Sequence, residues 1–252
     1  MFKKISVPLL ILLTVFFALG LSSVVAAAEV VDGLHNSYIY SAKDYILYLE
    51  NESKKDQEAV EVLKQFKALN HYQQELFVKA LQPETYIKIV EKVLNSKEGE
   101  KLFITIDNVK IPINSNKSYK DKSDFVPMSN LRWVKVEQKV ALFGINLTTF
   151  YTSVHFEHSG TNATRALSSS QGHSNYNPFM MVTPRGVSTP YISGGLAYAT
   201  GSWTIGITPT GGLFYSEDAE LSVRANATDQ WKRMWSTIPA WNTGWVWASN
   251  VY

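Results

Sequence analysis

The region from Leu131 to Asn250 constrains the fold most, because it alternates apolar and polar residues in short segments. Gly, Asn, Pro and Ser separate these segments. Successive side chains of a β-strand point to opposite faces, so each segment is a candidate strand with one buried face. There are enough candidates for two packed antiparallel sheets. We therefore predict an α+β fold, with a small N-terminal helical unit followed by an antiparallel, sandwich-like β domain over residues 130–252.

Two of these candidate strands can be described from their alternation. Residues 131–142 place three valines on one face and Trp133 with several charged residues on the other. In the next strand, Ile145 and Leu147 are out of phase with Phe150. We therefore expect a bulge or turn near residues 148–149 that resets the face of the strand.

The stretch from Tyr191 to Thr208 indicates a β-hairpin that turns at Gly201-Ser202. A type II′ turn requires glycine at its first central position, because φ must be positive there. The resulting register sets Leu196 opposite Ile207 and gives the ribbon one large apolar face. Other strands, a ligand or a lipid surface must cover that face. Since an arm of about nine residues approaches membrane-crossing length, a membrane-active toxin or antimicrobial protein is an alternative function.

The first third of the chain has helical periodicity. Ser41 and Asp44 have the spacing of a capping box at the start of the first helix, and Pro83 suits the first turn of the last. Each helix has one apolar side, so we expect a helical domain over residues 29–100. This domain either docks on the β-rich part or acts separately, as a pro-region or binding module. Four helices are expected, over about residues 42–50, 56–69, 72–81 and 83–94.

A second hairpin and a polar segment follow the helices, over residues 101–129. The hairpin turns at Asp107-Asn108 and sets Ile106 opposite Val109. Proline cannot donate a ladder hydrogen bond, so Pro112 predicts that the second strand lies at a sheet edge. Residues 114–124 are polar and charged without apolar periodicity, which is typical of a protease-sensitive linker.

The first 28 residues have the parts of a secretory signal peptide. Lys3 and Lys4 precede an apolar run over residues 7–21, and three alanines at positions 26–28 provide a small-residue cleavage site. We expect a mature chain that begins near Glu29 and is secreted. A retained membrane anchor is the alternative, but the run is short for a bilayer core of about 30 Å.

The chain contains no cysteine, so an exported protein of this size folds without disulfides. Together with the short Met-Phe-Lys-Lys start, this favours an extracellular protein of a Gram-positive bacterium. The formal net charge is +2, and removal of Lys3 and Lys4 leaves a charge near zero. Such a chain has no net positive electrostatic field to attract nucleic acid, so we expect no nucleic-acid partner. The glycine pairs lack a following helix that could cradle a phosphate, and we expect no cofactor.

Catalytic and metal-binding patterns are weak. His155 and His158 are the best metal candidates, but residues three apart on a strand point to opposite faces. His173 is expected in a loop, and Glu217 with Asp218 in a turn, where adjacent carboxylates cannot form the opposed pair of a glycosidase. The chain has no G-x-S-x-G motif. We predict no catalytic residue, and a secreted hydrolase remains a further alternative.

Tryptophans gather in the last part of the chain, beside basic residues. Alternation places Trp231, Arg233 and Trp235 on one face, and Trp245 with Trp247 on another. We expect at least one of these rows in the core, while an exposed row would form a flat binding platform. The preferred hypothesis is a non-enzymatic protein that binds a cell-wall glycan, matrix polymer or other extracellular surface. Its candidate binding residues are Trp231, Arg233, Trp235, Trp241, Trp245 and Trp247.

Overall fold

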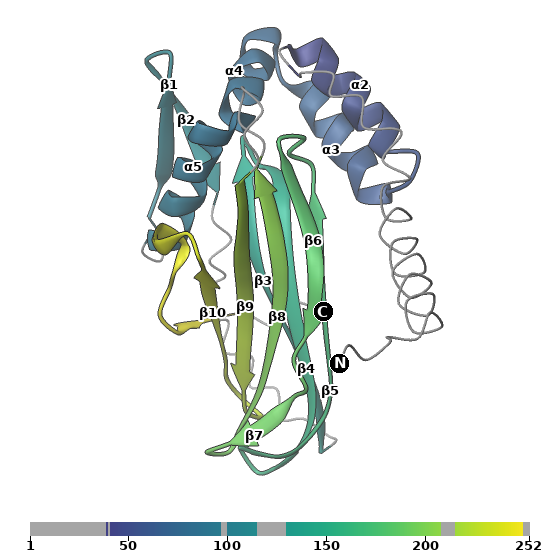
Figure 1. Cartoon of the computed structure of the whole chain (residues 1–252), viewed down its shortest axis with the longest axis vertical. Coiled ribbons are helices and arrows are strands. Elements are labelled where there is room, and N and C mark those ends of the chain that lie inside the picture. The colour runs from purple at the N-terminus through teal and green to yellow at the C-terminus, as the bar shows by residue number, and fades with distance from the viewer. Residues whose placement is uncertain (1–38, 40, 97–99, 115–129, 208–214, 249–252) are drawn as a thin grey trace, which may run out of the picture. The chain divides into compact units, whose positions relative to one another are not determined.

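The computed structural model describes residues 39, 41–96, 100–114, 130–207 and 215–248. The predicted signal peptide lies outside these residues, as does most of the predicted linker. Within them, four helices precede two antiparallel sheets, one of five strands and one of six (Figure 1). This order confirms the predicted α+β fold with a sandwich-like β domain. The boundaries predicted for the separate domains stay predictions.

All four predicted helices form, and the first and the last begin as expected. The Ser41 side chain accepts a hydrogen bond from the Asp44 amide, and the Asp44 carboxylate accepts one from the Ser41 amide. Pro83 is the first residue of the last helix. The helices are α2 (Ala42–Glu52), α3 (Gln57–Ala68), α4 (His71–Leu81) and α5 (Pro83–Asn95).

The five-stranded sheet begins with the hairpin predicted after the helices. Asp107 and Asn108 both have positive φ, 49° and 63°, as a type I′ turn requires. Ile106 lies opposite Val109, as expected. The strands, in both chain order and sheet order, are β1 (Leu102–Ile106), β2 (Val109–Asn114), β3 (Leu131–Leu142), β4 (Ile145–Ser159) and β5 (Asn162–Asn175).

Two details of this sheet differ from the sequence prediction. β2 lies between β1 and β3, so the expected edge position of β2 was wrong. Its pairing with β3 is limited to Ile113 and Asn114, because the ladder starts only after Pro112, which has no amide hydrogen. The predicted bulge in β4 is present, but Leu147 is the unpaired residue, just before the expected position.

The six-stranded sheet does not contain the hairpin predicted around Gly201. That residue lies in the middle of one continuous strand, and Leu196 and Ile207 are its two ends. The turn lies instead at Gly194 and Gly195, with φ of 56° and 75°. The strands are β6 (Met180–Val187), β7 (Tyr191–Ser193), β8 (Leu196–Ile207), β9 (Tyr215–Ala225), β10 (Gln230–Ser236) and β11 (Val246–Trp247). Their order is β11-β10-β9-β8-β6, and β7 also pairs with β8.

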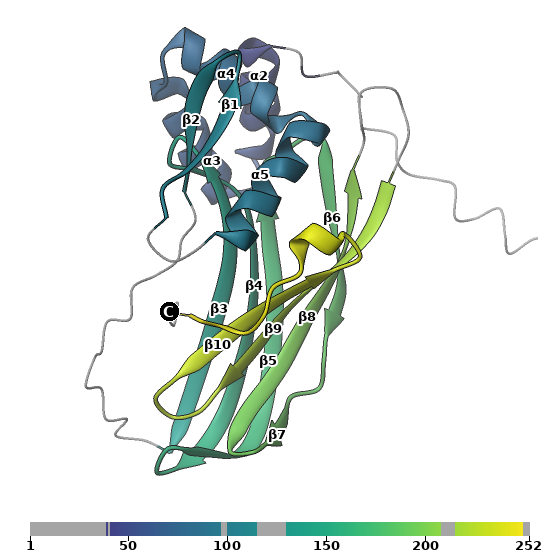
Figure 2. The ribbon, with the colours of Figure 1, turned by 90° about the vertical axis from the view of Figure 1, so that its left-hand side faces the viewer.

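Gly201 is required for close packing between the sheets, not for a turn. A Cβ atom there would lie 2.6 Å from Oγ1 of Thr152 and 2.8 Å from a ring carbon of Trp203. The Trp203 ring packs edge-on against Phe150 of the other sheet, with 5.0 Å between ring centres. Figure 2 shows the two sheets as separate layers, with β8, β9 and β10 in front of β3, β4 and β5. The sandwich therefore forms without the hairpin expected to organise it.

The helices dock on one end of the sandwich (Figure 1). The Tyr45 hydroxyl of α2 donates a hydrogen bond to the Tyr176 carbonyl over 2.9 Å. The hydroxyls of Tyr86 on α5 and Thr148 on β4 lie 2.7 Å apart. Buried residues of the helices and of both sheets form one hydrophobic cluster. Of the two arrangements considered from the sequence, the structure has the docked one.

Candidate functional site

One transverse row of the six-stranded sheet carries four aromatic residues and one arginine. Each residue is the direct cross-strand partner of the next, from β7 through β8, β9 and β10 to β11. Cross-strand partners share a face, so all five side chains emerge on the same side of the sheet. In order across the sheet, the row is Tyr191, Tyr198, Arg224, Trp231 and Trp247.

The row lies on the outer face, away from the other sheet. Ala197, next to Tyr198 in the chain, is fully buried, and so are Val223 and Ala225 on either side of Arg224. Because side chains alternate along a strand, Tyr198 and Arg224 must point outward. The rigid sheet thus holds the row in place.

Two further residues complete the surface. Trp245, just before β11, lies against two guanidinium groups: its ring centre is 4.6 Å from the Arg224 guanidinium carbon and 5.1 Å from that of Arg233. Arg224 also lies 5.0 Å from the ring centre of Trp231. At these distances a cation is attracted to the face of an aromatic ring. We call the set the aromatic–arginine band; it consists of Tyr191, Tyr198, Arg224, Trp231, Arg233, Trp245 and Trp247.

The two arginines of the band have no carboxylate partner among the described residues. Within the described residues, neither Arg224 nor Arg233 forms an ion pair or donates a side-chain hydrogen bond to the protein. The acidic Asp218 is on the same face of β9, but it pairs with Arg185 at 2.5 Å. The band therefore combines flat apolar rings with two positive charges that no side chain in the described part of the chain neutralises.

The structure separates the tryptophans predicted as one cluster. Trp241 lies in a short 3-10 helix, η1 (Pro239–Trp241), and is 1% exposed, so it belongs to the core. Trp235 is 42% exposed on the outer face of β10, beyond the band and opposite Glu220. The other candidates, Trp231, Arg233, Trp245 and Trp247, lie together in the band.

The expectation that one tryptophan row lies in the core was wrong. The inner face of β10 instead carries Lys232, Met234 and Ser236, of which Met234 and Ser236 are buried. Both faces of this strand mix polar and apolar residues, so alternation alone does not say which is inside. Among the described residues, the buried tryptophans are Trp203 and Trp241.

Three band residues were missed from the sequence. The turn at Gly194-Gly195 sets Tyr191 opposite Tyr198, and the pairings of β8, β9 and β10 bring Tyr198 and Arg224 into line with Trp231. A pair of glycines between alternating segments is itself a signal for a two-residue hairpin, and it identifies this turn.

The histidines do not converge. His155 is on the outer face of β4, whereas His158 is buried on the other face, with Nδ1 3.0 Å from the Gly160 carbonyl oxygen. His173 lies in β5 and not in a loop as expected, and burial lowers its pKa. It pairs with Phe150, far along the ladder from His158. Across the described ranges, no three His, Cys, Asp or Glu side chains form a group that could hold a metal ion.

Glu217 and Asp218 also differ from expectation, since both lie within β9 and not in a turn. Adjacent strand positions point to opposite faces. The Glu217 carboxylate accepts a hydrogen bond from the Thr237 hydroxyl, while Asp218 pairs with Arg185. These two carboxylates therefore do not face one another across a site.

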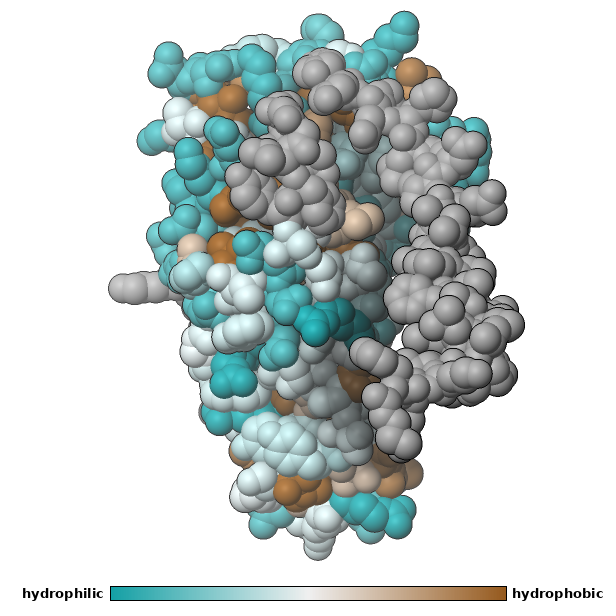
Figure 3. Space-filling view, in the orientation of Figure 1, coloured by the Kyte–Doolittle hydropathy of each residue, from teal (hydrophilic) through white to brown (hydrophobic). Residues whose placement is uncertain are grey.

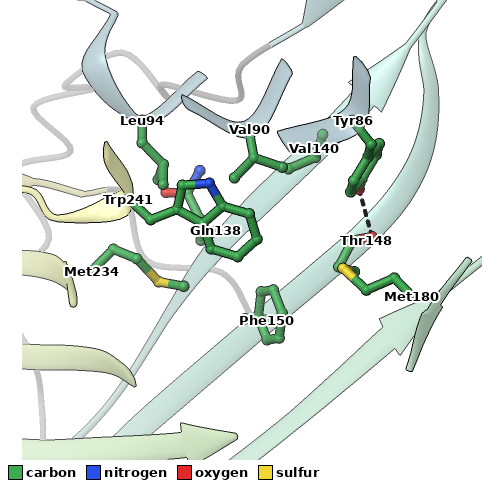
Figure 4. A pocket seen from close by; sticks show the side chains of 10 residues that line it. All are labelled: Tyr86, Val90, Leu94, Gln138, Val140, Thr148, Phe150, Met180, Met234 and Trp241. Carbon is green, nitrogen blue, oxygen red and sulfur yellow. Dashed lines mark hydrogen bonds between the residues drawn. The ribbon is translucent and has the colours of Figure 1, made fainter. Parts of the chain in front are cut away.

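A small apolar cavity lies between α5 and the sandwich (Figure 4). Its volume is about 10 Å³, at most the space that one water molecule needs. Tyr86 and Thr148 meet at one side of it, and Trp241 and Met234 line another. The cavity is a packing gap and not a ligand site.

A larger polar groove of about 490 Å³ lies between α3 and the outer face of the five-stranded sheet. Lys135 and Lys139 in this groove both pair with Glu137, at 2.9 and 2.6 Å. Burial alone would raise the pKa of Glu137, but these two lysines hold it below its usual range. The charged side chains of Lys135, Glu137 and Lys139, on the sheet side of the groove, are therefore paired with one another. The groove also contains three carboxylates from α3 and its cap: Asp56, Glu58 and Glu61.

Comparison with protein-family models, with curated proteins and with solved structures gave no match to this chain. Among the described residues, no helix combines the length and apolar character needed to cross a membrane. At the end of the sheets where β7 lies, the surface mixes apolar residues with pale, weakly polar ones (Figure 3). The geometry of the aromatic–arginine band is therefore the basis for a functional proposal.

Proposed function

We propose that this chain is a secreted, non-enzymatic bacterial protein whose β-sandwich binds an extracellular or cell-surface polymer through the aromatic–arginine band. The observation that carries the proposal is the row of aromatic residues around Arg224 on the outer face of the sheet. Aromatic and arginine side chains are enriched in binding surfaces, and tyrosine and tryptophan rings provide large contact areas with little loss of side-chain freedom. The flat faces of sugar rings suit such a surface.

The extracellular part of the proposal rests on the signal-like first 28 residues and on the absence of cysteine. Both features suit export from a Gram-positive bacterium. If the signal is cleaved where we expect, intact-mass measurement of protein recovered from the medium will give a chain that starts near Glu29. Recovery of the uncleaved chain from membranes alone would instead support an anchor.

No specific observation supports either of the two alternative functions. The pore-forming alternative was based on a hairpin around Gly201, which is not present. The hydrolase alternative required His155, His158 and His173 to meet a carboxylate in one cleft, and these histidines are spread over both faces and the length of β4 and β5. Dye release from liposomes remains the direct measurement for membrane activity.

Binding to isolated cell wall and to soluble glycans tests the proposal. Tyr191→Ala and Trp245→Ala remove two rings of the band, and each should weaken binding tenfold or more. Trp133→Ala is the matched control, because Trp133 is 60% exposed on the outer face of the other sheet. We expect this control to bind as the wild type does. Equal binding by all three variants, with unchanged circular dichroism, would refute a role for the band.

A further inference from the structure

The arginines of this chain fall into two groups. The sequence contains five, and three of them have protein partners. Arg165 pairs with Glu157 at 2.8 Å and Arg185 with Asp218 at 2.5 Å. Arg132 donates hydrogen bonds to the Asn226 carbonyl and the Gln230 side chain. Within the described residues, only the two arginines of the band, Arg224 and Arg233, contact aromatic rings without an acceptor.

These two guanidinium groups are close to one another. Both lie against the ring of Trp245, at 4.6 and 5.1 Å from its centre. Arginine is charged at every physiological pH and carries five N–H donors in a planar fork. Two like charges on one ring repel each other unless an anion comes between them or beside them. A bound carboxylate, sulfate or phosphate would relieve this repulsion and accept paired hydrogen bonds.

The length of the band indicates a ligand larger than a single anion. Its row crosses five strands, from Tyr191 on β7 to Trp247 on β11. Four interstrand spacings of about 4.8 Å give a row of about 19 Å. Tyr191 and Tyr198 are stacked at 5.0 Å on one side of Arg224, and Trp231 and Trp247 lie on the other. The positive charges are thus central, with aromatic rings on both sides.

We propose that the ligand is a linear anionic polysaccharide that runs across the strands. Its acidic groups bind Arg224 and Arg233, and its sugar rings lie against the tyrosines and tryptophans on either side. This inference rests on the proposed binding function and specifies its ligand class. Single-stranded nucleic acid also combines negative charge with stacking groups. The exported, nearly neutral chain favours the polysaccharide, since nucleic-acid binding depends on many phosphate contacts.

The test includes two polymers that share a backbone and differ in charge, polygalacturonate and its neutral methyl ester. The full chain is assayed for binding to both, and to heparin as a second anionic polysaccharide. We expect at least one of the two anionic polysaccharides to bind tenfold or more tightly than the methyl ester. Since the contacts are charged, an increase in NaCl from 50 to 500 mM should weaken that binding at least fivefold. Stronger binding of the methyl ester, of oligo-dT or of phosphatidylglycerol vesicles would overturn the inference.

Variants then assign the anionic preference to the band. Arg233→Gln should weaken binding of the anionic polymer at least fivefold, and because Arg233 is exposed, its fold should persist. Arg224→Lys keeps the charge but loses the planar fork, and it should give a smaller loss than Arg224→Gln. Arg165→Gln is the matched control for charge, since Arg165 lies on the other sheet and pairs with Glu157. Equal loss in this control would overturn the inference.

The ring variants separate this inference from the proposed function. If Tyr191→Ala and Trp245→Ala lose binding while Arg233→Gln and Arg224→Gln do not, the band binds a polymer but does not select negative charge. In that case the binding function stands and the anionic specificity is wrong. If neither the ring variants nor the arginine variants lose binding, both are wrong.

Discussion

The side-chain amide of Gln171 on β5 forms two hydrogen bonds with the backbone of Ser202 on β8, across the space between the sheets. The Ser202 amide donates to Oε1 over 2.6 Å, and Nε2 donates to the Ser202 carbonyl over 3.2 Å. The neighbouring strand β6 has a register shift here, between Pro184 and Gly186. One side-chain amide therefore satisfies a donor and an acceptor beside this irregularity, and buried backbone groups need such partners.

Gln171→Met should destabilise the protein, because methionine has a similar size but can replace neither hydrogen bond. We expect the free energy of unfolding to fall by about 1–3 kcal/mol, since each of the two part-buried hydrogen bonds contributes about 0.5–1.5 kcal/mol. Urea denaturation, monitored by tryptophan fluorescence, measures this change in the free energy of unfolding. Gln57→Met, at the exposed start of α3, is the control and should change stability by less than about 0.5 kcal/mol. Similar values for both variants would mean that the Ser202 contact contributes nothing.

Gly201→Ala should also destabilise the sandwich. The added Cβ would lie 2.6 Å from Thr152 Oγ1 and 2.7 Å from Gln171 Oε1, so these side chains of the other sheet must shift. Such overpacking costs about 1–3 kcal/mol. Gly244→Ala is the matched control, because a Cβ there meets no atom within 4 Å. A thermal melt in which both variants unfold at the wild-type temperature would contradict the close approach at Gly201.

Trp241→Ala and Trp235→Ala should differ sharply in stability, although both were candidate binding residues. Trp241 is almost fully buried between α5 and the sandwich, and its removal should cost about 3–5 kcal/mol. Trp235 is 42% exposed, so its loss should cost less than about 1 kcal/mol. Chemical denaturation of the two variants measures this difference. Equal stabilities would place Trp241 outside the core.

His173 should make stability depend on pH near neutrality. Burial lowers the pKa of His173 in the folded state, while a hydrogen bond with the Val182 backbone partly opposes the shift. An unfolded histidine has a pKa of about 6.5, so the unfolded chain binds a proton first as the pH falls. The stability that neutral His173 provides is therefore present above about pH 6.5 and declines at lower pH.

This dependence can be isolated by comparison of His173→Gln with the wild type. The difference in unfolding free energy between the two should change as the pH falls from 7.5 to 5, with the wild type losing more stability. His71→Gln is the control, since His71 is exposed at the start of α4, and its curve should stay parallel to that of the wild type. Direct NMR titration of His173 would contradict the prediction if its pKa were above 6.5.

Local signals predicted the helices and the first hairpin well. Ser41 begins α2 as a cap, and Asp107-Asn108 forms the turn of β1 and β2, because in both cases a few adjacent residues determine the geometry. Gly201 was misassigned because both a turn and close contact between sheets require glycine. Only the side chains packed around Gly201 distinguish the two, and of these Thr152 lies on the other sheet, distant in sequence.

The candidate site was predicted in part. The tryptophans of the band were identified from their density near the C-terminus, but its tyrosines and Arg224 depend on strand register. Register follows from the position of the turn, and an error there moves every later pairing. The outward direction of Trp231 follows from the buried neighbours of its partner Arg224, which the sequence of β10 alone does not contain.

The contacts that fasten the helices to the sandwich also determine the outcome of a backbone cut between residues 115 and 129. The N-terminal fragment would carry α2 to α5 and β1 to β2, and the C-terminal fragment all remaining strands. Tyr45 would still bond to Tyr176, and Ile113 would still pair with β3. The nicked molecule would therefore stay together as a noncovalent two-piece complex, and the pieces would separate only in denaturant.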